Sequence, residues 1–421
     1  MDGITLAVVG AGLRGIVYAE AAVASGRARV VAVAEPDRVR RERFAHRFGV
    51  PAAGCYSDWS DLAAAGRVAD AAVISTLDRL HTEPAVAFAG LGYHLLLEKP
   101  MAPSEAECLR IAEAVEKAGI VFTVGHVMRY TSYTRRLKEM LDSGRCGQIT
   151  GVQHLEPIGW WHLAHSFVRG NWRREDESGP LLLTKSCHDL DWLMYVLGSR
   201  PTRISSFGSL LHFRPEQAPP GAGMRCTDCA VESECPYSAV RLYVDALHGP
   251  RRFWPLGAVT DADTADGVLD ALRTGPYGRC VYRCDNDVVD HQVVITEHPG
   301  GVTASFTMTA FTELEHRKTR IFGTHGYLSG NGRMLRYIDF RTGAQEIIDT
   351  HTGDDASAAG GHGGGDAGLT ETFLSAVATR DQSVLGTDVW ECVASHRAVW
   401  AAERARRSGT VVDFELDAAT C

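Results

Sequence analysis

The stretch that decides the fold is Ile4-Thr-Leu-Ala-Val-Val-Gly10-Ala-Gly12-Leu-Arg-Gly15, near the start of the chain. An apolar, β-branched run predicts a buried strand, and the G-x-G-x-x-G after it opens an Ala-rich helical segment. In such a turn the first Gly allows the tight bend, the second lets a pyrophosphate approach, and the third lets helix and strand pack closely. The helix N-terminus supplies amide donors for the phosphates, with Leu13 and Arg14 beside them. The stretch therefore predicts a dinucleotide-binding domain.

Strand and helix patterns continue to alternate after this turn. The strand-like runs are apolar throughout, which is typical of a parallel sheet covered on both faces by helices. We therefore expect an α/β domain, a doubly wound parallel Rossmann sheet, over residues 1–125. The expected strands are 29–34, 71–75, 93–97 and 120–124, and the expected helices are 14–25, 37–48, 83–89 and 104–118.

Glu35 ends the second expected strand, about 20 positions after the Gly-rich turn. A carboxylate there accepts hydrogen bonds from the adenosine ribose hydroxyls and repels a 2′-phosphate, so it favours NAD over NADP. Arg38 lies nearby and is of a type that can accommodate such a phosphate. We interpret Arg38 as a solvated helix residue.

Composition and charge exclude several classes of protein. The chain has 421 residues, of which 45% are hydrophobic, and a formal net charge of −9. This length suggests two to three domains, and the composition excludes a disordered chain. The acidic balance argues against a nucleic-acid partner. No apolar run is long enough for a membrane helix and no signal-like segment opens the chain, so we expect a cytoplasmic protein with no membrane partner.

The second half of the chain changes its pattern. Short β-branched runs separated by turns predict a mostly antiparallel meander, and the last segment, residues 369–407, is helical in composition. We expect an α+β domain over residues 126–421, with an insertion at about 215–255 that breaks the strand pattern. The expected strands are 149–155, 203–212, 290–297, 303–311, 318–322, 326–329 and 335–339.

Three short motifs resemble one oxidoreductase family. Leu97-Glu98-Lys99-Pro100 follows an expected strand, Ser75-Thr76 and His81 follow the strand before it, and Gly125-His-Val-Met-Arg-Tyr130 joins the two halves. With the Gly-rich turn, this order resembles the Gfo/Idh/MocA (glucose–fructose oxidoreductase / inositol dehydrogenase) family. Many members have Asn where this chain has His126.

The resemblance implies a Rossmann domain followed by a domain with a large, open, mostly antiparallel sheet. The nicotinamide would lie in the cleft between them, and the C-terminal helices could pack back toward the Rossmann domain. Ser75, Thr76, His81, Glu98 and Lys99 would then lie around the cofactor. A homo-oligomer, dimer or tetramer, is the family expectation.

Catalytic roles are suggested for residues from both halves. Lys99 would hydrogen-bond the reacting hydroxyl, and His188, in a His-x-x-Asp pattern, would be the general base. Asp191 could orient His188 or touch the substrate. Many family members carry Asp four residues before this His, whereas this chain has Thr184 followed by Lys185. A second lysine could supply a neutral amine base, or it could bind an acidic substrate such as a uronate.

Two stretches supply residue types suited to a sugar. Residues 159–173 contain Trp161, His162, Arg169 and Trp172, which can stack on a ring or hold hydroxyls and carboxylates. The alternative is ordinary packing with solvated charges. His362 lies in a Gly-rich stretch at about 353–368, which is either a flexible linker or a lid over the substrate.

Three of the eleven cysteines lie close together in the expected insertion. Cys226, Cys229 and Cys235 have C-x2-C-x5-C spacing, which fits thiolate ligation of a structural zinc. The fourth ligand is open between Cys280, Cys284, His212 and His248. An iron–sulfur site is less favoured because a C-x2-C-x2-C run is absent, and reduced thiols without metal are the alternative.

The leading functional hypothesis is an NAD-dependent oxidoreductase that acts on a secondary hydroxyl, or ketone, of a sugar, sugar acid or cyclitol. Lys99 and His188 would handle the proton. An alternative is a glycosidase or lyase that uses tightly bound NAD catalytically, oxidising and then reducing its substrate around an elimination. A non-catalytic NAD-binding regulator is the third reading.

Overall fold

Six parallel strands form the N-terminal sheet of the computed structural model, which describes residues 3–351 and 362–414. Their order is β3-β2-β1-β4-β5-β6, so the strand order reverses direction between β1 and β4. This confirms the expected doubly wound sheet. The strands are β1 (Ile4–Val9), β2 (Ala28–Ala34), β3 (Cys55–Tyr56), β4 (Ala71–Ile74), β5 (His94–Leu97) and β6 (Phe122–Val124).

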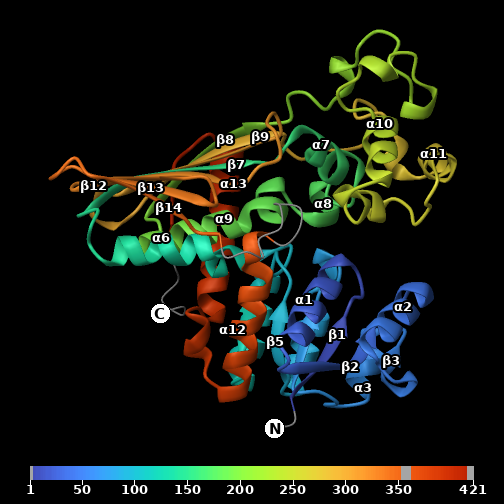
Figure 1. Cartoon of the computed structure of the whole chain (residues 1–421), viewed down its shortest axis with the longest axis horizontal. Coiled ribbons are helices and arrows are strands. Elements are labelled where there is room, and N and C mark those ends of the chain that lie inside the picture. The colour runs from blue at the N-terminus through green and yellow to red at the C-terminus, as the bar shows by residue number, and fades with distance from the viewer. Residues whose placement is uncertain (1–2, 352–361, 415–421) are drawn as a thin grey trace.

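Helices cover both faces of this sheet (Figure 1). Their ends follow the local chemistry: the Ser104 hydroxyl caps α5 by accepting from the Glu107 amide at 3.3 Å, and Gly119 ends it in the left-handed region at φ 60°. The short pair β3 and α3 has no counterpart in the sequence prediction. The helices are α1 (Leu13–Ala24), α2 (Arg38–Phe48), α3 (Trp59–Ala64), α4 (Thr82–Gly90) and α5 (Glu105–Ala118).

The second sheet has nine strands in the order β14-β13-β12-β11-β7-β10-β9-β8-β15. Only β7 and β10 pair in parallel and the other described pairs are antiparallel, which confirms the expected mostly antiparallel sheet. The strands are β7 (Ile149–Pro157), β8 (Arg203–Ser209), β9 (His291–Glu297), β10 (Thr303–Thr309), β11 (Lys318–Gly323), β12 (Gly326–Gly330), β13 (Met334–Asp339), β14 (Gln345–Asp349) and β15 (Val412–Asp413).

Three helices lie under one face of the second sheet (Figure 1). They are α6 (Ser132–Asp142), α9 (Leu181–Leu197) and α13 (Val389–Ser408). α13 also packs against α5, and α12 (Gly365–Thr379) packs against α1, so the last helices contact the N-terminal domain. No helix in the described part of the chain is long and apolar enough to cross a membrane.

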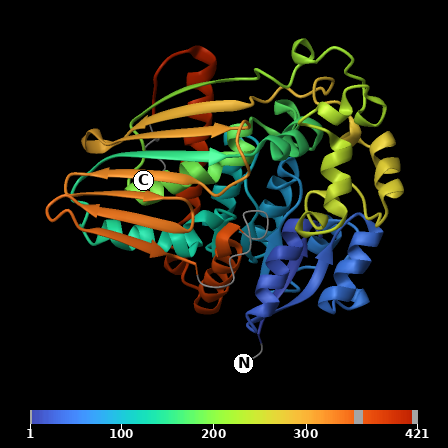
Figure 2. The same cartoon turned by 45° about the horizontal axis from the view of Figure 1, so that its top comes forward.

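The chain leaves the sheet between β8 and β9 and forms a separate lobe (Figure 2). This excursion contains short 3-10 turns, α10 (Ala239–Val244) and α11 (Ala265–Thr274), with a small apolar cluster of its own that includes Tyr243 and Leu272. It runs from residue 210 to 290 and is therefore longer than the expected insertion, because 256–290 is also built from turns and one helix. We call residues 210–290 the inserted lobe.

Candidate active site

The Gly-rich turn has the geometry that a pyrophosphate requires. Gly10 has φ 93°, and a Cβ there would lie 2.7 Å from the Ser75 carbonyl oxygen. A Cβ on Gly15 would lie 2.1 Å from the Gly10 carbonyl oxygen, whereas nothing lies within 4 Å of one on Gly12. Gly12 also caps α1 without a side-chain hydrogen bond, and no acidic residue lies in the first turn. The α1 N-terminus is thus left with amide donors beside open space, which fits an anion.

Glu35 lies at the end of β2, next to this turn. It is buried, and its carboxylate accepts hydrogen bonds from the Ala11 amide at 2.9 Å and the Asp37 amide at 3.0 Å. The negative charge is therefore fixed beside the phosphate loop. Arg38 pairs with Glu42 at 3.1 Å on the exposed face of α2, as expected for a solvated helix residue.

Three residues predicted to surround the cofactor join neighbouring loops. The Ser75 hydroxyl donates to the Gly10 carbonyl at 2.8 Å, and the Thr76 hydroxyl donates to the Leu80 carbonyl at 3.1 Å. The buried His81 ring lies 2.8 Å from the Pro100 carbonyl oxygen through Nδ1. These contacts hold together the loops after β1, β4 and β5, at the carboxyl edge of the sheet where such folds bind ligands. Their contact with the cofactor itself stays a prediction.

Arg14 and Glu98 form an ion pair with each other. Arg14 also donates to the Tyr18 hydroxyl at 2.7 Å and pairs with Asp366 at 2.5 Å. Asp366 belongs to the first turn of α12, so the end of the Gly-rich stretch contacts the phosphate loop directly. The side chain of His362 and residues 352–361 lie outside the described residues, and the predicted lid is not tested there.

Lys99 connects the two domains. It follows β5, and its ammonium donates to the Thr184 carbonyl oxygen on α9 at 2.5 Å. The helix is not regular at this point, because Ser186 has non-helical φ and ψ of −124° and 15°. Lys99 therefore lies where the N-terminal sheet faces the kinked part of α9.

A buried network of charges surrounds the next turn of α9. Lys185 pairs with Glu156 at 2.8 Å, and Glu156 also pairs with Arg317 at 2.6 Å. Arg317 donates in turn to Asp189 at 2.9 Å. Burial, followed by the nearby cations Arg317 and Lys99, lowers the pKa of Lys185, and Glu156 opposes this shift. The pKa of Lys185 moves in the direction that a neutral amine base needs.

His188 is held in this network as a hydrogen-bond acceptor. Its Nε2 lies 2.7 Å from Nη2 of Arg317, which can only donate. Nε2 is therefore unprotonated and the ring is neutral, with its proton on Nδ1. Asp189 Oδ2 lies 3.5 Å from the same nitrogen. Burial would raise the pKa of Asp189, but Arg317 and His154 hold it well below its ordinary value.

Asp191 does not have the position expected of an orienting carboxylate for His188. Its two oxygens each lie 2.6 Å from Arg129, and one lies 3.1 Å from Nδ1 of His126. All three side chains are buried. Asp191 therefore anchors α9 to the segment that joins the two domains, and Asp189 is the carboxylate beside His188.

The aromatic residues of the stretch 159–173 lie in different places and have different partners. Burial, followed by Lys185 and His165, lowers the pKa of His162 well below its ordinary value, which places His162 near Lys185. Trp161 packs on Trp254 with ring centroids 5.3 Å apart. The Trp172 indole donates to Asp78 at 2.8 Å. Because Asp78 follows β4, Trp172 ties the second domain to the first.

The side chain of Arg169 packs against the inserted lobe. A π-helical turn over Ala164–Arg169 directs its side chain into the inserted lobe, where it is fully buried. Its guanidinium donates to the carbonyl oxygens of Arg279 at 2.8 Å and Tyr237 at 2.7 Å. The structure therefore gives Arg169 a packing role, and its contact with a substrate hydroxyl or carboxylate stays a prediction.

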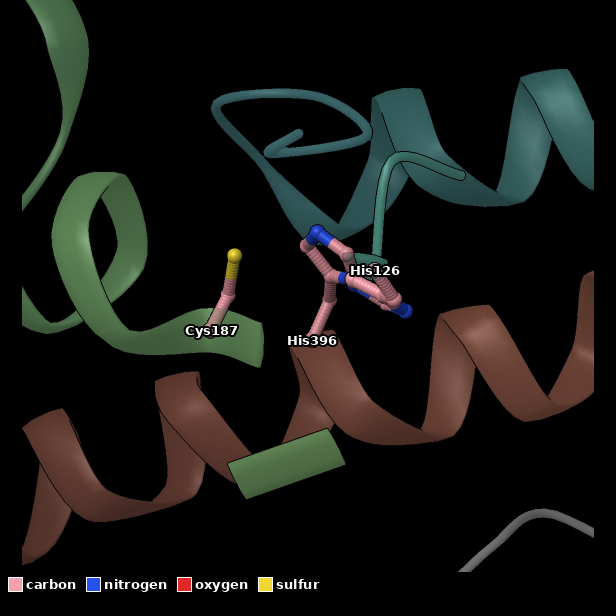
Figure 3. A group of neighbouring side chains, drawn as sticks. All are labelled: His126, Cys187 and His396. Carbon is pink, nitrogen blue, oxygen red and sulfur yellow. The ribbon is translucent and has the colours of Figure 1, made fainter. Parts of the chain in front are cut away.

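Figure 3 shows His126, Cys187 and His396, which come from the segment after β6, α9 and α13. Their potential ligand atoms lie within 4.8 Å of one another. However, Nδ1 of His396 donates to the Cys392 carbonyl at 2.7 Å and Nε2 accepts from the Met101 amide at 2.8 Å. No lone pair of His396 is left for a metal, so this trio is a packed cluster.

Sequence reasoning missed two partners of the site. Glu156 lies near the end of β7 and Arg317 directly before β11, in the second sheet. No motif marks either residue in the sequence. A buried Glu in an otherwise apolar strand end was the one available signal, since such carboxylates are almost always paired.

Comparison with known proteins supports the two-domain reading. Residues 4–126 match the profile "Oxidoreductase family, NAD-binding Rossmann fold", and residues 134–240 match the "GFO/IDH/MocA C-terminal domain". The putative oxidoreductase YteT of Bacillus subtilis is 26% identical over 358 residues, which are 78% of this chain and 81% of that protein.

One further relative and one solved structure are also similar to this chain. The 2,7-anhydro-N-acetylneuraminate hydratase of Escherichia coli is 27% identical over 156 residues, covering 37% of this chain and 41% of that protein. A structure of levoglucosan dehydrogenase in complex with NADH and levoglucosan superposes with a TM-score of 0.70 at 17% identity, covering 99% of this chain and 100% of that one. At that identity the likeness shows a shared fold.

Proposed function

The chain belongs to the Gfo/Idh/MocA family of NAD(P)-binding oxidoreductases, and from that premise we propose that it is an NAD-dependent oxidoreductase. Its substrate would be a sugar, sugar acid or cyclitol that reacts at a secondary hydroxyl or the corresponding ketone. NAD is proposed over NADP because Glu35 places a buried carboxylate beside the phosphate loop. The fold match to levoglucosan dehydrogenase, whose structure contains NADH and levoglucosan, supports a sugar-type substrate.

The position of Lys99 is the observation that carries this proposal. Its ammonium leaves the carboxyl edge of the nucleotide-binding sheet and reaches α9 of the second domain at Thr184. Lys185 is the next residue of the same helix, and His188 lies about one turn beyond Thr184. We infer that the Lys99 ammonium would bind a hydroxyl oxygen and that the His188 imidazole would accept its proton.

The chain's own residues have limited tasks in this reaction. Gly12 and the α1 amides would hold the pyrophosphate and Glu35 the adenosine ribose. Bound NAD supplies the hydride acceptor. Lys99 would hold the reacting hydroxyl, and neutral His188 would take its proton at Nε2, exchanging its hydrogen bond from Arg317 for the substrate. Glu156 and Asp189 would keep the added positive charge compensated.

The test is turnover by Lys99→Ala and His188→Ala. A sugar and cyclitol library is first screened by thermal shift in the presence of NAD, because a ligand that binds only the folded state raises the melting temperature. NADH formation with the best ligand is then followed by absorbance. Both variants should lose several decades of turnover, while NADH titration shows that they still bind the cofactor.

Lys117→Ala is the matched control, since Lys117 is an exposed lysine at the end of α5 in the same domain. It should keep normal turnover. Near-normal rates in both site variants, with cofactor binding intact, would reject the assignment of Lys99 and His188.

A second candidate is a redox-neutral elimination or hydration that uses NAD catalytically. Two observations favour it: the relative that is named a hydratase, and the Lys185–Glu156 pair, which supplies acid–base groups beyond Lys99 and His188. In this case NAD stays bound during turnover and no net NADH forms. Product analysis under conditions where absorbance of NADH does not rise would distinguish it from a dehydrogenase.

The open face of the second sheet supports a homo-oligomer. Phe207 on β8 and Ile295 on β9 are 66% and 46% exposed, and Ile347 on β14 is 68% exposed. These apolar side chains lie on a sheet whose other face is covered by helices. We propose that two copies pair through this face, and light scattering of the purified protein would measure the assembly.

A further inference from the structure

Four cysteines from separate segments of the chain surround one small pocket in the inserted lobe. Cys226, Cys229 and Cys235 are the three that share a sequence pattern, and Cys280 is about 45 residues away. The pocket lies where the lobe meets the helical turn that ends at Arg169. It is separate from the charge network around Lys185.

The backbone brings the fourth cysteine to the other three. Arg225 and Arg279 form an antiparallel bridge, and the Cys280 amide donates to the Met224 carbonyl at 3.0 Å. Cys226 and Cys280 are therefore the residues that directly follow the two members of this bridge. Two short 3-10 turns, Cys226–Asp228 and Glu232–Glu234, then return Cys229 and Cys235 to the same pocket.

Donors point at the sulfur atoms. The Gly223 amide lies 3.4 Å from the sulfur of Cys229, and Nη2 of Arg169 lies 3.5 Å from the sulfur of Cys226. Arg169 is 1% exposed, lines the pocket, and its Nη1 has no hydrogen-bond partner among the described residues. A buried guanidinium with an unused donor therefore faces these sulfur atoms and can compensate part of the charge of a thiolate cluster.

The other residues considered as a fourth ligand are placed elsewhere. Cys284 donates its thiol to the Cys280 carbonyl at 3.3 Å and does not line the pocket. His212 lies 3.1 Å from the Tyr282 hydroxyl through Nε2. His248 is exposed on the surface of the lobe.

We propose that Cys226, Cys229, Cys235 and Cys280 bind one Zn²⁺ as four thiolates, with Arg169 compensating part of the negative charge. Binding releases the four thiol protons to solvent and changes no oxidation state. The sulfurs of a filled tetrahedral site lie about 3.8 Å apart. Among the described residues only the trio of Figure 3 has ligand atoms all within 4.8 Å, so the proposed site requires the cysteine side chains to turn toward one another on binding.

The ion has a structural task. The lobe has only a small apolar cluster and few regular elements, so it has little core with which to hold its turns. Four bonds to one ion replace that missing core. Because Arg169 ends the helical turn Ala164–Arg169, the same bonds also fix the end of that turn.

The test is elemental analysis of the full chain purified without chelator, together with Cys280→Ser, Cys284→Ser and Cys280→His. One zinc per chain is expected in the parent and in Cys284→Ser, and none or a small fraction in Cys280→Ser. Cys280→His keeps a zinc ligand and should retain the ion even where the serine variant fails to fold. After cobalt exchange, its sulfur-to-cobalt absorption should be about a quarter weaker than that of the parent.

Several results would overturn the proposal. Absence of zinc in the parent, combined with failure to take up added zinc or cobalt, excludes the site. Equal loss of metal in Cys284→Ser excludes the assignment of Cys280. Iron with acid-labile sulfide in place of zinc, or a disulfide between any two of these cysteines by alkylation and mass spectrometry, also contradicts it.

Discussion

Glu35 offers a measurable test of cofactor choice. Its carboxylate is buried and accepts the Ala11 amide at 2.9 Å, so the charge lies against the loop that would carry the phosphates. Two unit charges 4 Å apart interact by about 1 kcal/mol in water and about 4 kcal/mol near a protein surface. For a 2′-phosphate beside Glu35 we take about 2 kcal/mol, which corresponds to about 30-fold in affinity.

The perturbation is Glu35→Gln, which removes the charge but keeps an oxygen that can accept the Ala11 amide. The assay is fluorescence titration with NADH and NADPH, which needs no knowledge of the substrate. The ratio of the NADPH to the NADH dissociation constant should fall by about 30-fold. NADH binding itself should weaken by about 1 kcal/mol, because charge-assisted hydrogen bonds to the ribose become neutral ones.

Glu83→Gln is the matched control. Glu83 is exposed on α4, where it pairs with Arg110 at 2.9 Å, and its removal changes the net charge equally. The ratio should not change in this variant. A parent protein that binds both cofactors equally, or a Glu35→Gln variant with an unchanged ratio, would refute the reasoning.

Three more predictions follow from buried groups. Arg129→Met leaves the Asp191 carboxylate buried without its bidentate partner, so urea unfolding should show a loss of about 3–5 kcal/mol, and Asp191→Asn should cause a similar loss. Burial raises the pKa of Cys187 to about 12, so at pH 8 iodoacetamide should modify it in urea but not in the native protein, as mass spectrometry will show. Burial lowers the pKa of His165 and of His396 to about 3. Their unfolded pKa is about 6.5, so the stability that comes from their neutral forms is complete above pH 6.5. Below that pH the free energy of unfolding falls by about 1.4 kcal/mol per pH unit for each histidine, down to about pH 3. The urea midpoint should therefore be lower at pH 5.5 than at pH 7.

The main features of the fold could be predicted because they follow from local patterns. The Gly-rich turn and the apolar runs predicted β1, β2, β4, β5 and β6, and the β-branched runs predicted seven of the nine strands in the second sheet. The sequence did not predict β3 and β15, which are two residues long and form only by pairing with a neighbouring strand. β14 alternates Glu with Ile on an exposed edge and has little apolar signal.

The site was only partly predictable, since its charges are paired by tertiary contacts. Lys99 and His188 were found through motifs, but nothing in the sequence places Arg317 beside His188 or Glu156 beside Lys185. Arg169 shows how direction matters: its residue type suits a sugar, whereas the π-helical turn directs its side chain into the lobe. Residue type and spacing suggest chemistry, whereas the direction of a side chain depends on backbone geometry that no motif encodes.

The inserted lobe begins and ends at one paired position, because Ser209 on β8 lies opposite His291 on β9. In a sheet these two strands could be joined by a tight hairpin. Closing a loop of about 80 residues in place of about 5 costs only about 2.5 kcal/mol of chain entropy. Gain or loss of the whole lobe in evolution would therefore leave the sheet register unchanged. The lobe could be exchanged between lineages as one unit, while the nucleotide-binding domain and its hydride chemistry stay the same.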